Sequence, residues 1–494
     1  MDTFAGSIWW VRLILHRGIA AIYLVAFLSA LHQFRALLGE RGLLPTPEFL
    51  RGVSFLDAPS IFHLRYGDRL ASAVALAGVV LAGVALSGLS EAGPFWLSAA
   101  VWLAMWALYL SIVNVGQAFY AFGWESMLLE AGFFAAFLGP ARMAPSVVPV
   151  LLLRWMLFRV ELGAGLIKLR HDRCWRDLTC LYFHYETQPL PNPLSWFFHR
   201  MPKRMHRLSV LFSHFVQLIV PIGLFAPQPI ASVAGGLTIF HQVWLVVSGN
   251  YSWLNWLTIV LGASALSVPL PAPTALHARP AGYDSFALLL VGMTIVLSVK
   301  PILNLASKNQ AMNLSYNPLH LVNTYGAFGQ VTRDRYEIVL EGTESEDPNA
   351  GEWREYECRA KPGRVSRMPP QVAPYHLRLD WLLWFLPFST HVYEGSVVVF
   401  GYDLWFMRLV ERLLEADRPT LRLLGRDPFS GRAPRFVRAS YYRYQYTSWA
   451  ERRRTRAWWR REALGEYMPP MSLEALRRRM GLTRSSTGRG RAGS

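Results

Sequence analysis

Long apolar segments follow one another along the chain up to about residue 304. A bilayer core of about 30 Å needs roughly 20 apolar residues in a spanning helix. The clearest segments of this kind are ALAGVVLAGVALSGL (75–89) and ALLLVGMTIVLSV (287–299). The whole pattern predicts an α-helical multi-pass membrane domain over residues 1–304, with about nine spanning helices at 8–31, 70–90, 95–115, 120–139, 145–166, 207–227, 229–248, 253–270 and 284–303.

After this domain the pattern changes to short alternating segments. GQVTRDRYEIVLEG (329–342) and EWREYECRA (352–360) alternate as strands do and predict a β-hairpin with a long acidic loop. SVVVFG (396–401) predicts another strand, and YDLWFMRLVERLLEA (402–416) has helical spacing. We therefore expect a small extramembrane α+β domain with β-strands over residues 305–447.

The end of the chain, residues 448–494, is a basic tail. From residue 449 it carries 12 arginines and four glutamates, with Trp458 and Trp459 among them. Arginine- and tryptophan-rich segments of this kind can bind acidic lipid head groups or nucleic acid, and lipid fits a membrane protein better. The residues from Arg484 onward are small, polar and basic, which predicts disorder at the end of the chain.

Composition agrees with a membrane protein. The chain is 52% hydrophobic and 17% charged, whereas soluble chains carry about 25% charged residues. The net charge of +17 would suggest nucleic acid in a soluble protein. Here the basic residues flank apolar segments, so we expect membrane lipid as a partner and no nucleic acid. All but five of the 50 basic residues are arginine, which is typical of a GC-rich, bacterial genome.

The basic residues gather on one side of the predicted topology. Loops 32–69 and 167–206 share a side with everything after the last helix and hold most of the loop arginines, whereas the opposite loops hold Arg142 and Arg279. The positive-inside rule would put the basic side in the cytoplasm. Orientation stays open at this point, because long domains translocate whatever their charge.

Several ionisable residues fall inside the predicted spanning helices, where they are costly and mark function or packing. Arg154, Glu161 and Lys168 follow one another at seven-residue spacing, which keeps them near one stripe of a helix. One interpretation is a functional line of charges along this helix. In the other, Arg154 and Lys168 extend to opposite membrane interfaces, and Glu161 between them is neutralised by a neighbouring group. Glu125 and Glu130 lie in the preceding apolar segment.

The sequence has no motif that specifies a known chemistry. GxSxG, P-loop, HExxH and dinucleotide-binding fingerprints do not occur. The three cysteines, Cys174, Cys180 and Cys358, cannot form a disulfide framework, and there is no CxxC pair for zinc. We expect no metal and no cofactor, and the sequence favours a protein that is not an enzyme.

Four long stretches resemble the lipase maturation factor family: WRDLTCLYFHYETQPLPNPLSWFFHRMP (175–202), LVNTYGAFGQVTRDRYEIVLEG (321–342), PPQVAPYHLRLDWLLWF (369–385) and RDPFSGRAPRFVRASYYRYQYT (426–447). The resemblance implies a multi-pass protein of the endoplasmic reticulum membrane that assists the folding and maturation of secreted proteins such as lipases. In a bacterium the corresponding location is the cell (inner) membrane.

The resemblance also implies that the C-terminal portion contacts client proteins, either secreted lipases or others. The third stretch mixes polar and aromatic groups, as interfaces do. The client-binding candidates are Gln371, Pro374, Tyr375, His376 and Asp380.

A shorter stretch, AGLIKLRHDRCW (164–175), is similar to the part of the vitamin K-dependent γ-carboxylases that carries an active-site lysine, and Lys168 falls at that lysine. This similarity implies an alternative: a membrane enzyme acting on a lipid-soluble substrate, with Lys168 as base. Glu161 and His184 are the further catalytic candidates. The other interpretation of Lys168 is an anchor that holds the following loop at the level of the lipid head groups.

Overall fold

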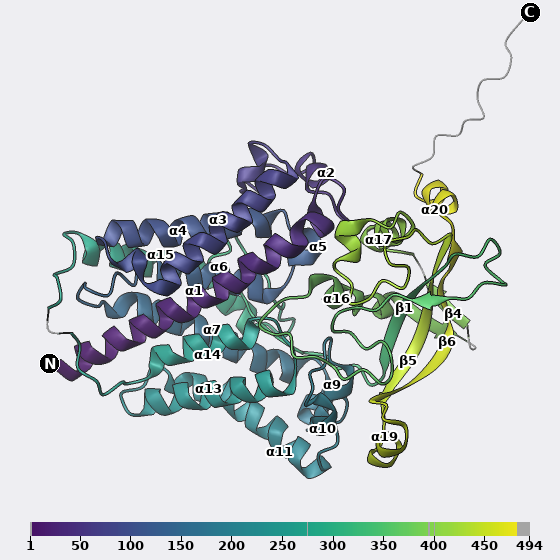
Figure 1. The fold of residues 1–494 in the computed structure, drawn as a ribbon. Coiled ribbons are helices and arrows are strands. Elements are labelled where there is room, and N and C mark those ends of the chain that lie inside the picture. The colour runs from purple at the N-terminus through teal and green to yellow at the C-terminus, as the bar shows by residue number, and fades with distance from the viewer. Residues whose placement is uncertain (1, 274, 394–395, 400, 482–494) are drawn as a thin grey trace, which may run out of the picture. The chain divides into compact units, whose positions relative to one another are not determined.

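The computed structural model describes residues 2–481 apart from 274, 394–395 and 400. The chain forms two compact units, whose elements are labelled in Figure 1. We call them the membrane unit (Met1–Arg35, Thr46–Arg333 and Pro369–Arg378) and the C-terminal unit (Ala36–Pro45, Asp334–Met368 and Leu379–Ser494).

The unit boundaries differ from the predicted domains 1–304 and 305–447. Residues 305–333 and 369–378 belong to the membrane unit, although their composition is polar. The reason is that they carry hydrogen-bonding groups that satisfy charged residues of the helices, among them Asn323, Tyr325 and Arg378.

The multi-pass helical prediction is confirmed. Within the described residues, six helices are long and apolar enough to cross a membrane: Gly6–Leu38, Asp68–Ser87, Phe95–Asn114, Lys203–Gly223, Ile230–Ser248 and Tyr283–Ala306. In the labels of Figure 1 they are α1 (Asp2–Leu38), α3, α4, α11 (Lys203–His214) continued by a π-helix (Phe215–Ile219) and α12 (Val220–Gly223), α13, and α15.

The other three predicted spans are helical, but they are too short or too highly charged to be counted as membrane-spanning helices. The helices α6 (Gly123–Ala135, 13 residues) and α14 (Leu254–Gly262, 9 residues) are shorter than the roughly 20 residues that span a bilayer. Helix α7 (Val147–Arg170) has 24 residues but carries five charged side chains. All three pack against other helices of the unit, so protein contacts replace lipid around them.

Five short helices occupy the connections of the membrane unit. The predicted loop 167–206 is largely folded as α8 (Arg173–Arg176), α9 (Leu181–Thr187) and α10 (Ser195–His199). The remaining two are α2 (Thr46–Leu50) and α5 (Gln117–Tyr120).

The C-terminal unit is built on an antiparallel sheet in the order β2-β1-β5-β6. The predicted hairpin is present, because β1 (Arg335–Thr343) pairs with β2 (Arg354–Glu355). The longer partner of β1 is β5 (Phe436–Tyr446), with Arg335 opposite Tyr444. Sequence analysis did not predict a strand in this tyrosine-rich segment. A separate hairpin joins β3 (Thr390–Tyr393) to β4 (Ser396–Val399).

Helix α17 (Leu404–Leu414) is the predicted helix of 402–416. Its buried residues Phe406, Leu409, Val410 and Leu413 recur at helical spacing and form one apolar stripe. The unit also contains α16 (Arg378–Leu383), which begins at the last residue of the membrane unit, and α18 (Arg418–Leu421).

The basic tail is folded over most of its described residues, and sequence analysis had assigned no helix or strand to it. It contains α19 (Trp449–Thr455), β6 (Trp459–Met471) and α20 (Leu473–Arg479). Strand β6 completes the sheet beside β5, and its two arginines form ion pairs, Arg460 with Glu451 and Arg461 with Glu355. The segment predicted to be disordered, from Arg484 onward, lies outside the described residues.

Candidate functional site

A glycine of α7 allows a neighbouring helix to come close. A Cβ atom on Gly165 would lie 3.0 Å from the backbone carbonyl oxygen of Gln217, so only glycine fits without movement. Gln217 belongs to the π-helical turn after α11, and such turns occur frequently at functional sites. The glycine-rich run before Lys168 thereby brings the side chain of Gln217 to the lysine.

Lys168 is buried, with 5% of its surface exposed. Its Nζ donates a hydrogen bond to Oε1 of Gln217 at 2.7 Å and to Oγ of Ser213 at 3.4 Å. The ammonium lies 4.9 Å from the ring centre of Trp175, a distance at which a cation is attracted to an aromatic face. The head-group anchor interpretation of Lys168 is therefore wrong, because the side chain points into the unit.

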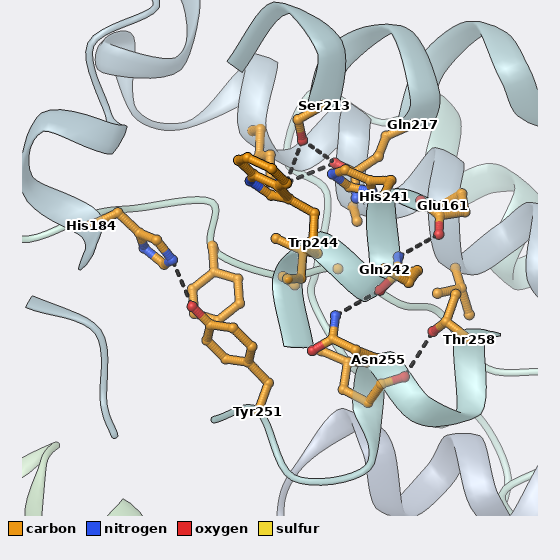
Figure 2. A pocket seen from close by; sticks show the side chains of 18 of the residues that line it. Glu161, His184, Ser213, Gln217, His241, Gln242, Trp244, Tyr251, Asn255 and Thr258 are labelled. Carbon is orange, nitrogen blue, oxygen red and sulfur yellow. Dashed lines mark hydrogen bonds between the residues drawn. The ribbon is translucent and has the colours of Figure 1, made fainter. Parts of the chain in front are cut away.

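Glu161 begins a chain of buried hydrogen bonds (Figure 2). Its Oε1 accepts from Nε2 of Gln242 at 2.6 Å, and Oε1 of Gln242 accepts from Nδ2 of Asn255, also at 2.6 Å. Helices α7, α13 and α14 are joined in this way. Glu161 is fully buried.

His184, on α9, is held in one tautomer. Tyr251 donates its hydroxyl proton to Oε1 of Gln188 at 2.6 Å, so the 2.9 Å contact between Nε2 of His184 and the same hydroxyl requires the imidazole to donate. Burial, with a smaller effect of the nearby Lys168 charge, lowers the pKa of His184 to about 3. The ring is therefore neutral near pH 7, with its Nδ1 unprotonated.

These three side chains line one cavity of about 260 Å³ in the membrane unit. Figure 2 shows the polar groups entering it from several helices. Most of the wall is apolar, including Val160, Phe212, Trp244, Leu254 and Phe328. A cavity with apolar walls and a few convergent polar groups is the usual form of a small-molecule site.

Arg154, the third member of the predicted charged stripe, lies apart from this cavity. Its guanidinium donates to the backbone carbonyls of Leu224 (3.1 Å) and Ser264. The functional line of charges is thus reduced to Glu161 and Lys168, and Arg154 ties α7 to the ends of two other helices.

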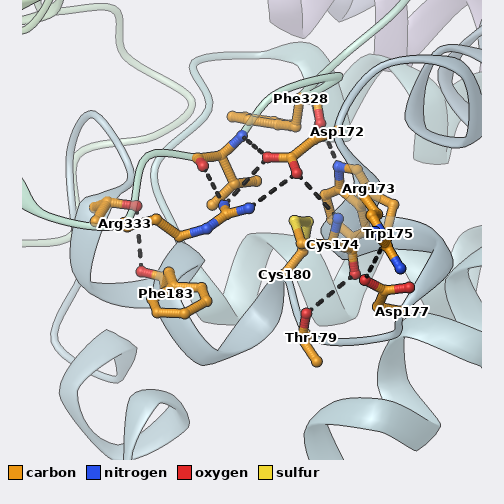
Figure 3. Close-up of a disulfide and its surroundings, with 12 residues drawn as sticks. Asp172, Arg173, Cys174, Trp175, Asp177, Thr179, Cys180, Phe183, Phe328 and Arg333 are labelled. Atoms are coloured by element: carbon orange, nitrogen blue, oxygen red, sulfur yellow. Dashed lines mark hydrogen bonds and ion pairs between the residues drawn. A yellow bond between two sulfur atoms is a disulfide. The ribbon is translucent and has the colours of Figure 1, made fainter.

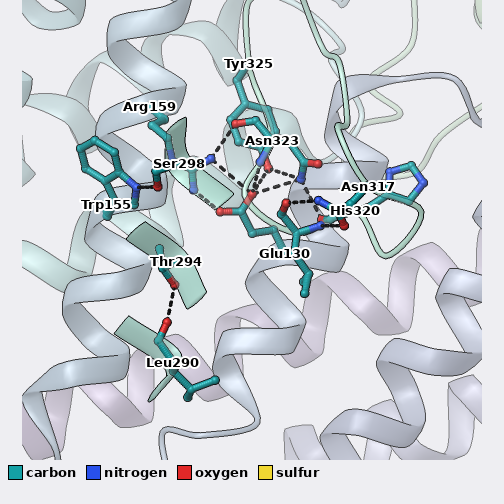
Figure 4. Close-up of polar contacts among 11 residues, drawn as sticks. Glu130, Trp155, Arg159, Leu290, Thr294, Ser298, Asn317, His320, Asn323 and Tyr325 are labelled. Atoms are coloured by element: carbon teal, nitrogen blue, oxygen red, sulfur yellow. Dashed lines mark hydrogen bonds and ion pairs between the residues drawn. The ribbon is translucent and has the colours of Figure 1, made fainter. Parts of the chain in front are cut away.

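Glu130 is neutralised by a buried arginine that sequence analysis did not single out (Figure 4). Arg159 forms an ion pair with it, and both side chains are buried. Oε2 of Glu130 also accepts from the hydroxyl of Tyr325 at 2.8 Å and from the backbone of Asn323 at 2.9 Å. Arg159 is an ionisable residue inside the predicted spanning helix 145–166, so the sequence did carry a signal that it needs a buried partner.

Glu125 is satisfied in the same manner by a segment distant in sequence. Oε1 of Glu125 accepts from Nη1 of Arg378 at 2.6 Å, and the hydroxyl of Tyr109 donates to Oε2. His376 Nδ1 lies 3.5 Å from the same carboxylate. Glu130 and Glu125 therefore each join helices to a segment that is distant in sequence, residues 323–325 for Glu130 and residue 378 for Glu125.

A disulfide joins Cys174 to Cys180 (Figure 3), and sequence analysis did not predict it. Asp172 fixes the loop around it, accepting from the backbone of Cys174 (3.0 Å) and Val331 (3.2 Å) and from Nη2 of Arg333 (2.9 Å). The two sulfurs and the Asp172 carboxylate lie near one another, but sulfurs bonded to each other are not thiolate ligands for a metal.

The predicted client-binding residues do not form one exposed set. Gln371 is exposed, and Pro374 and Tyr375 are partly buried. His376 is fully buried against Trp124, Phe122 and Trp253. Asp380 is also buried, and its Oδ2 accepts from the backbone of Ala360 and Lys361. Burial removes His376 and Asp380 from direct contact with a client in this conformation.

The fold and the site together define a multi-pass membrane protein that has a cavity with apolar walls and a few convergent polar groups, and an α+β C-terminal unit. Residues 10–269 match the lipase maturation factor transmembrane domain, and residues 321–469 match the lipase maturation factor C-terminal domain. The chain belongs to the lipase maturation factor family.

Relatives match along nearly the whole chain. Lipase maturation factor 1 of Bos taurus is 42% identical, over 96% of this chain and 91% of the relative. Lipase maturation factor 1 of Homo sapiens is 40% identical, over 96% and 89%. Lipase maturation factor 2 of Homo sapiens is 28% identical, over 96% and 85%. No solved structure matches the chain.

Proposed function

We propose that this chain is a membrane-anchored maturation factor that assists secreted proteins such as lipases. The observation that carries the proposal is the match of residues 10–269 and 321–469 to the two domains of the family, with relatives named lipase maturation factor 1 over 96% of the chain. The cavity containing Lys168, Glu161 and His184 fits ligand binding without requiring chemistry, and the relatives' names describe maturation factors and no enzyme.

We also propose that the disulfide loop faces an oxidising compartment. Disulfides persist in the endoplasmic reticulum lumen, the periplasm and outside the cell, and are rare in the cytosol. The Cys174–Cys180 bridge therefore argues against the cytoplasmic side that the arginine asymmetry favours. Arg333 is bound to Asp172 in this loop and directly precedes the C-terminal unit, so that unit is proposed to lie on the same side. This location is the endoplasmic reticulum lumen in a eukaryote and the periplasmic side of the inner membrane in a bacterium.

This orientation suits client contact, because a secreted lipase folds on that side of the membrane. Gln371, Pro374 and Tyr375 remain the proposed client-binding residues of the segment 369–378. Gln371 is the exposed member, although its Oε1 also accepts from Asn192 at 3.1 Å.

The proposal is tested by deleting the gene in the organism that carries it and measuring its secreted lipases. We expect normal lipase mRNA and a several-fold lower ratio of lipase activity to lipase mass, restored by re-expression of the chain. An unchanged ratio for every secreted lipase would rule out this function.

A further inference from the structure

The charged groups of the cavity already balance one another. Among its lining residues, Lys168 is the one basic residue besides histidines, and Glu161 is the one carboxylate. No arginine and no aspartate lines the cavity. A ligand with a net charge would disturb this balance in a site where water cannot screen it, so the site favours a neutral ligand.

Two buried polar atoms of the cavity have no hydrogen-bond partner within the described part of the chain. They are Oε2 of Glu161 and Nδ1 of His241. Glu161 is fully buried and His241 is 3% exposed, and leaving such atoms unmatched costs free energy. The carboxylate oxygen needs a donor, whereas the Lys168 ammonium offers a proton to an acceptor. A hydroxyl group can serve both.

The cavity opens towards the lipid-facing side of two spanning helices. Leu208 of α11 and Phe240 of α13 line it and are 58% and 57% exposed. In a spanning helix, large exposed apolar side chains face lipid. An acyl chain can therefore leave between these helices while the polar head stays inside.

We propose that this cavity binds a neutral, single-chain amphiphile with a hydroxyl-bearing head group, of the monoacylglycerol class. One hydroxyl donates to Glu161 and an ester or hydroxyl oxygen accepts from Lys168, and the chain passes Leu208 and Phe240. This inference goes beyond the maturation of client proteins and does not depend on it.

The test uses the full chain purified in detergent and a monoacylglycerol with a photoactivatable diazirine in its acyl chain. We expect saturable labelling of peptides from α11 and α13. Monoolein should compete at concentrations about tenfold lower than oleate or lysophosphatidate, which carry the same kind of chain on an anionic head. Oleate competing as well as monoolein would overturn the proposal, as would labelling that does not saturate.

A matched pair of variants tests the position of the ligand. Ala164 lines the cavity and is buried, whereas Val243 of α13 does not line it and is 44% exposed. Ala164→Phe should lower saturable labelling about tenfold, and Val243→Phe should leave it within about twofold. Equal labelling of both variants and the parent would contradict the site. If Ala164→Phe fails to fold, the competition experiment on the parent decides alone.

Discussion

Nη1 of Arg378 lies 2.6 Å from Oε1 of Glu125, and both side chains are fully buried although 253 residues separate them in sequence. The guanidinium carbon also lies 3.4 Å from the ring centre of Tyr120. A charge buried in this way is stable only with its partner. This pair therefore fixes the segment 369–378 to α6.

Removing one partner of this pair should destabilise the membrane unit strongly. Arg378→Met leaves the Glu125 carboxylate buried without its cation, and the expected loss is about 3–5 kcal/mol. The measurement is the apparent melting temperature of the purified protein in detergent. As a matched control, Arg279→Met removes an arginine from the more exposed Arg279–Asp284 pair. The expected loss of stability for this control is about 0–1 kcal/mol. Equal losses in the two variants would contradict the role assigned to Arg378.

The cysteines should differ in reactivity. Cys174 and Cys180 are bonded to each other, whereas Cys358 is free and the pKa of its thiol is raised by burial and by the nearby Asp380. A maleimide–polyethylene glycol reagent should leave the native protein unlabelled, add one label after denaturation, and add three after denaturation with reduction. Three labels without reduction would show that the disulfide does not form in the membrane.

Asp172 should stabilise the disulfide loop through its charge. Burial alone would raise the pKa of this carboxyl, but hydrogen bonds from Arg333 and from the backbone of Cys174 and Val331 outweigh burial and lower it. A lowered folded-state pKa gives stability that is complete above the unfolded value of about 3.9 and is lost as the pH falls through the folded-state value.

Asp172→Asn should therefore lower the free energy of unfolding by about 2 kcal/mol. The loss should be the same at pH 5.5 and at pH 7.5. The difference in melting temperature from the parent should narrow only below about pH 4. Asp177→Asn is the control, because Asp177 is half exposed and pairs only with the exposed Arg173, so about 0.5 kcal/mol or less is expected. A cost for Asp172→Asn that changes between pH 5.5 and pH 7.5 would assign the effect to another group.

Lys168→Arg distinguishes a hydrogen-bonding cation from a catalytic base. Arginine stays protonated and cannot act as a base, and the cavity of about 260 Å³ has room for its longer head. We expect this variant to support lipase maturation within about twofold of the parent. Lys168→Met removes the 2.7 Å donor of Gln217 Oε1 and leaves it the longer hydrogen bond from Ser213 at 3.4 Å, so this variant should lose about 1–3 kcal/mol of stability. Loss of function in Lys168→Arg at normal abundance would instead favour the enzyme hypothesis.

The membrane domain could be predicted because the length and the apolar composition of a spanning helix can be recognised in the sequence. The segments that failed that test, α6, α7 and α14, are interior helices. Their polar residues are satisfied by groups far along the chain, such as Arg378 and Asn323. Single-sequence periodicity contains no information about those partners.

The same reason explains why the burial of His376 and the folding of strand β6 could not be predicted from the sequence. A mixture of polar and aromatic residues is typical of an interface, but His376 is enclosed by aromatic rings that come from two other parts of the chain, Phe122 and Trp124 in one and Trp253 in the other. Strand β6 carries charged side chains that pair with residues of other strands, as Arg461 does with Glu355 and Glu462 with Arg443. In contrast, the convergence of Glu161 and Lys168 on one cavity follows from their place on one helix, which the sequence did predict.

The most direct test of the account is rescue of a secreted dimeric lipase in cells that lack lipase maturation factor 1. The chain is expressed beside human lipase maturation factor 1 as the positive control, at matched amounts in the membrane fraction. The quantity measured is lipase activity divided by lipase mass in the medium. The account predicts a ratio several-fold above that of cells with empty vector. A ratio equal to empty vector, with the positive control active and this chain folded in the membrane, would contradict it.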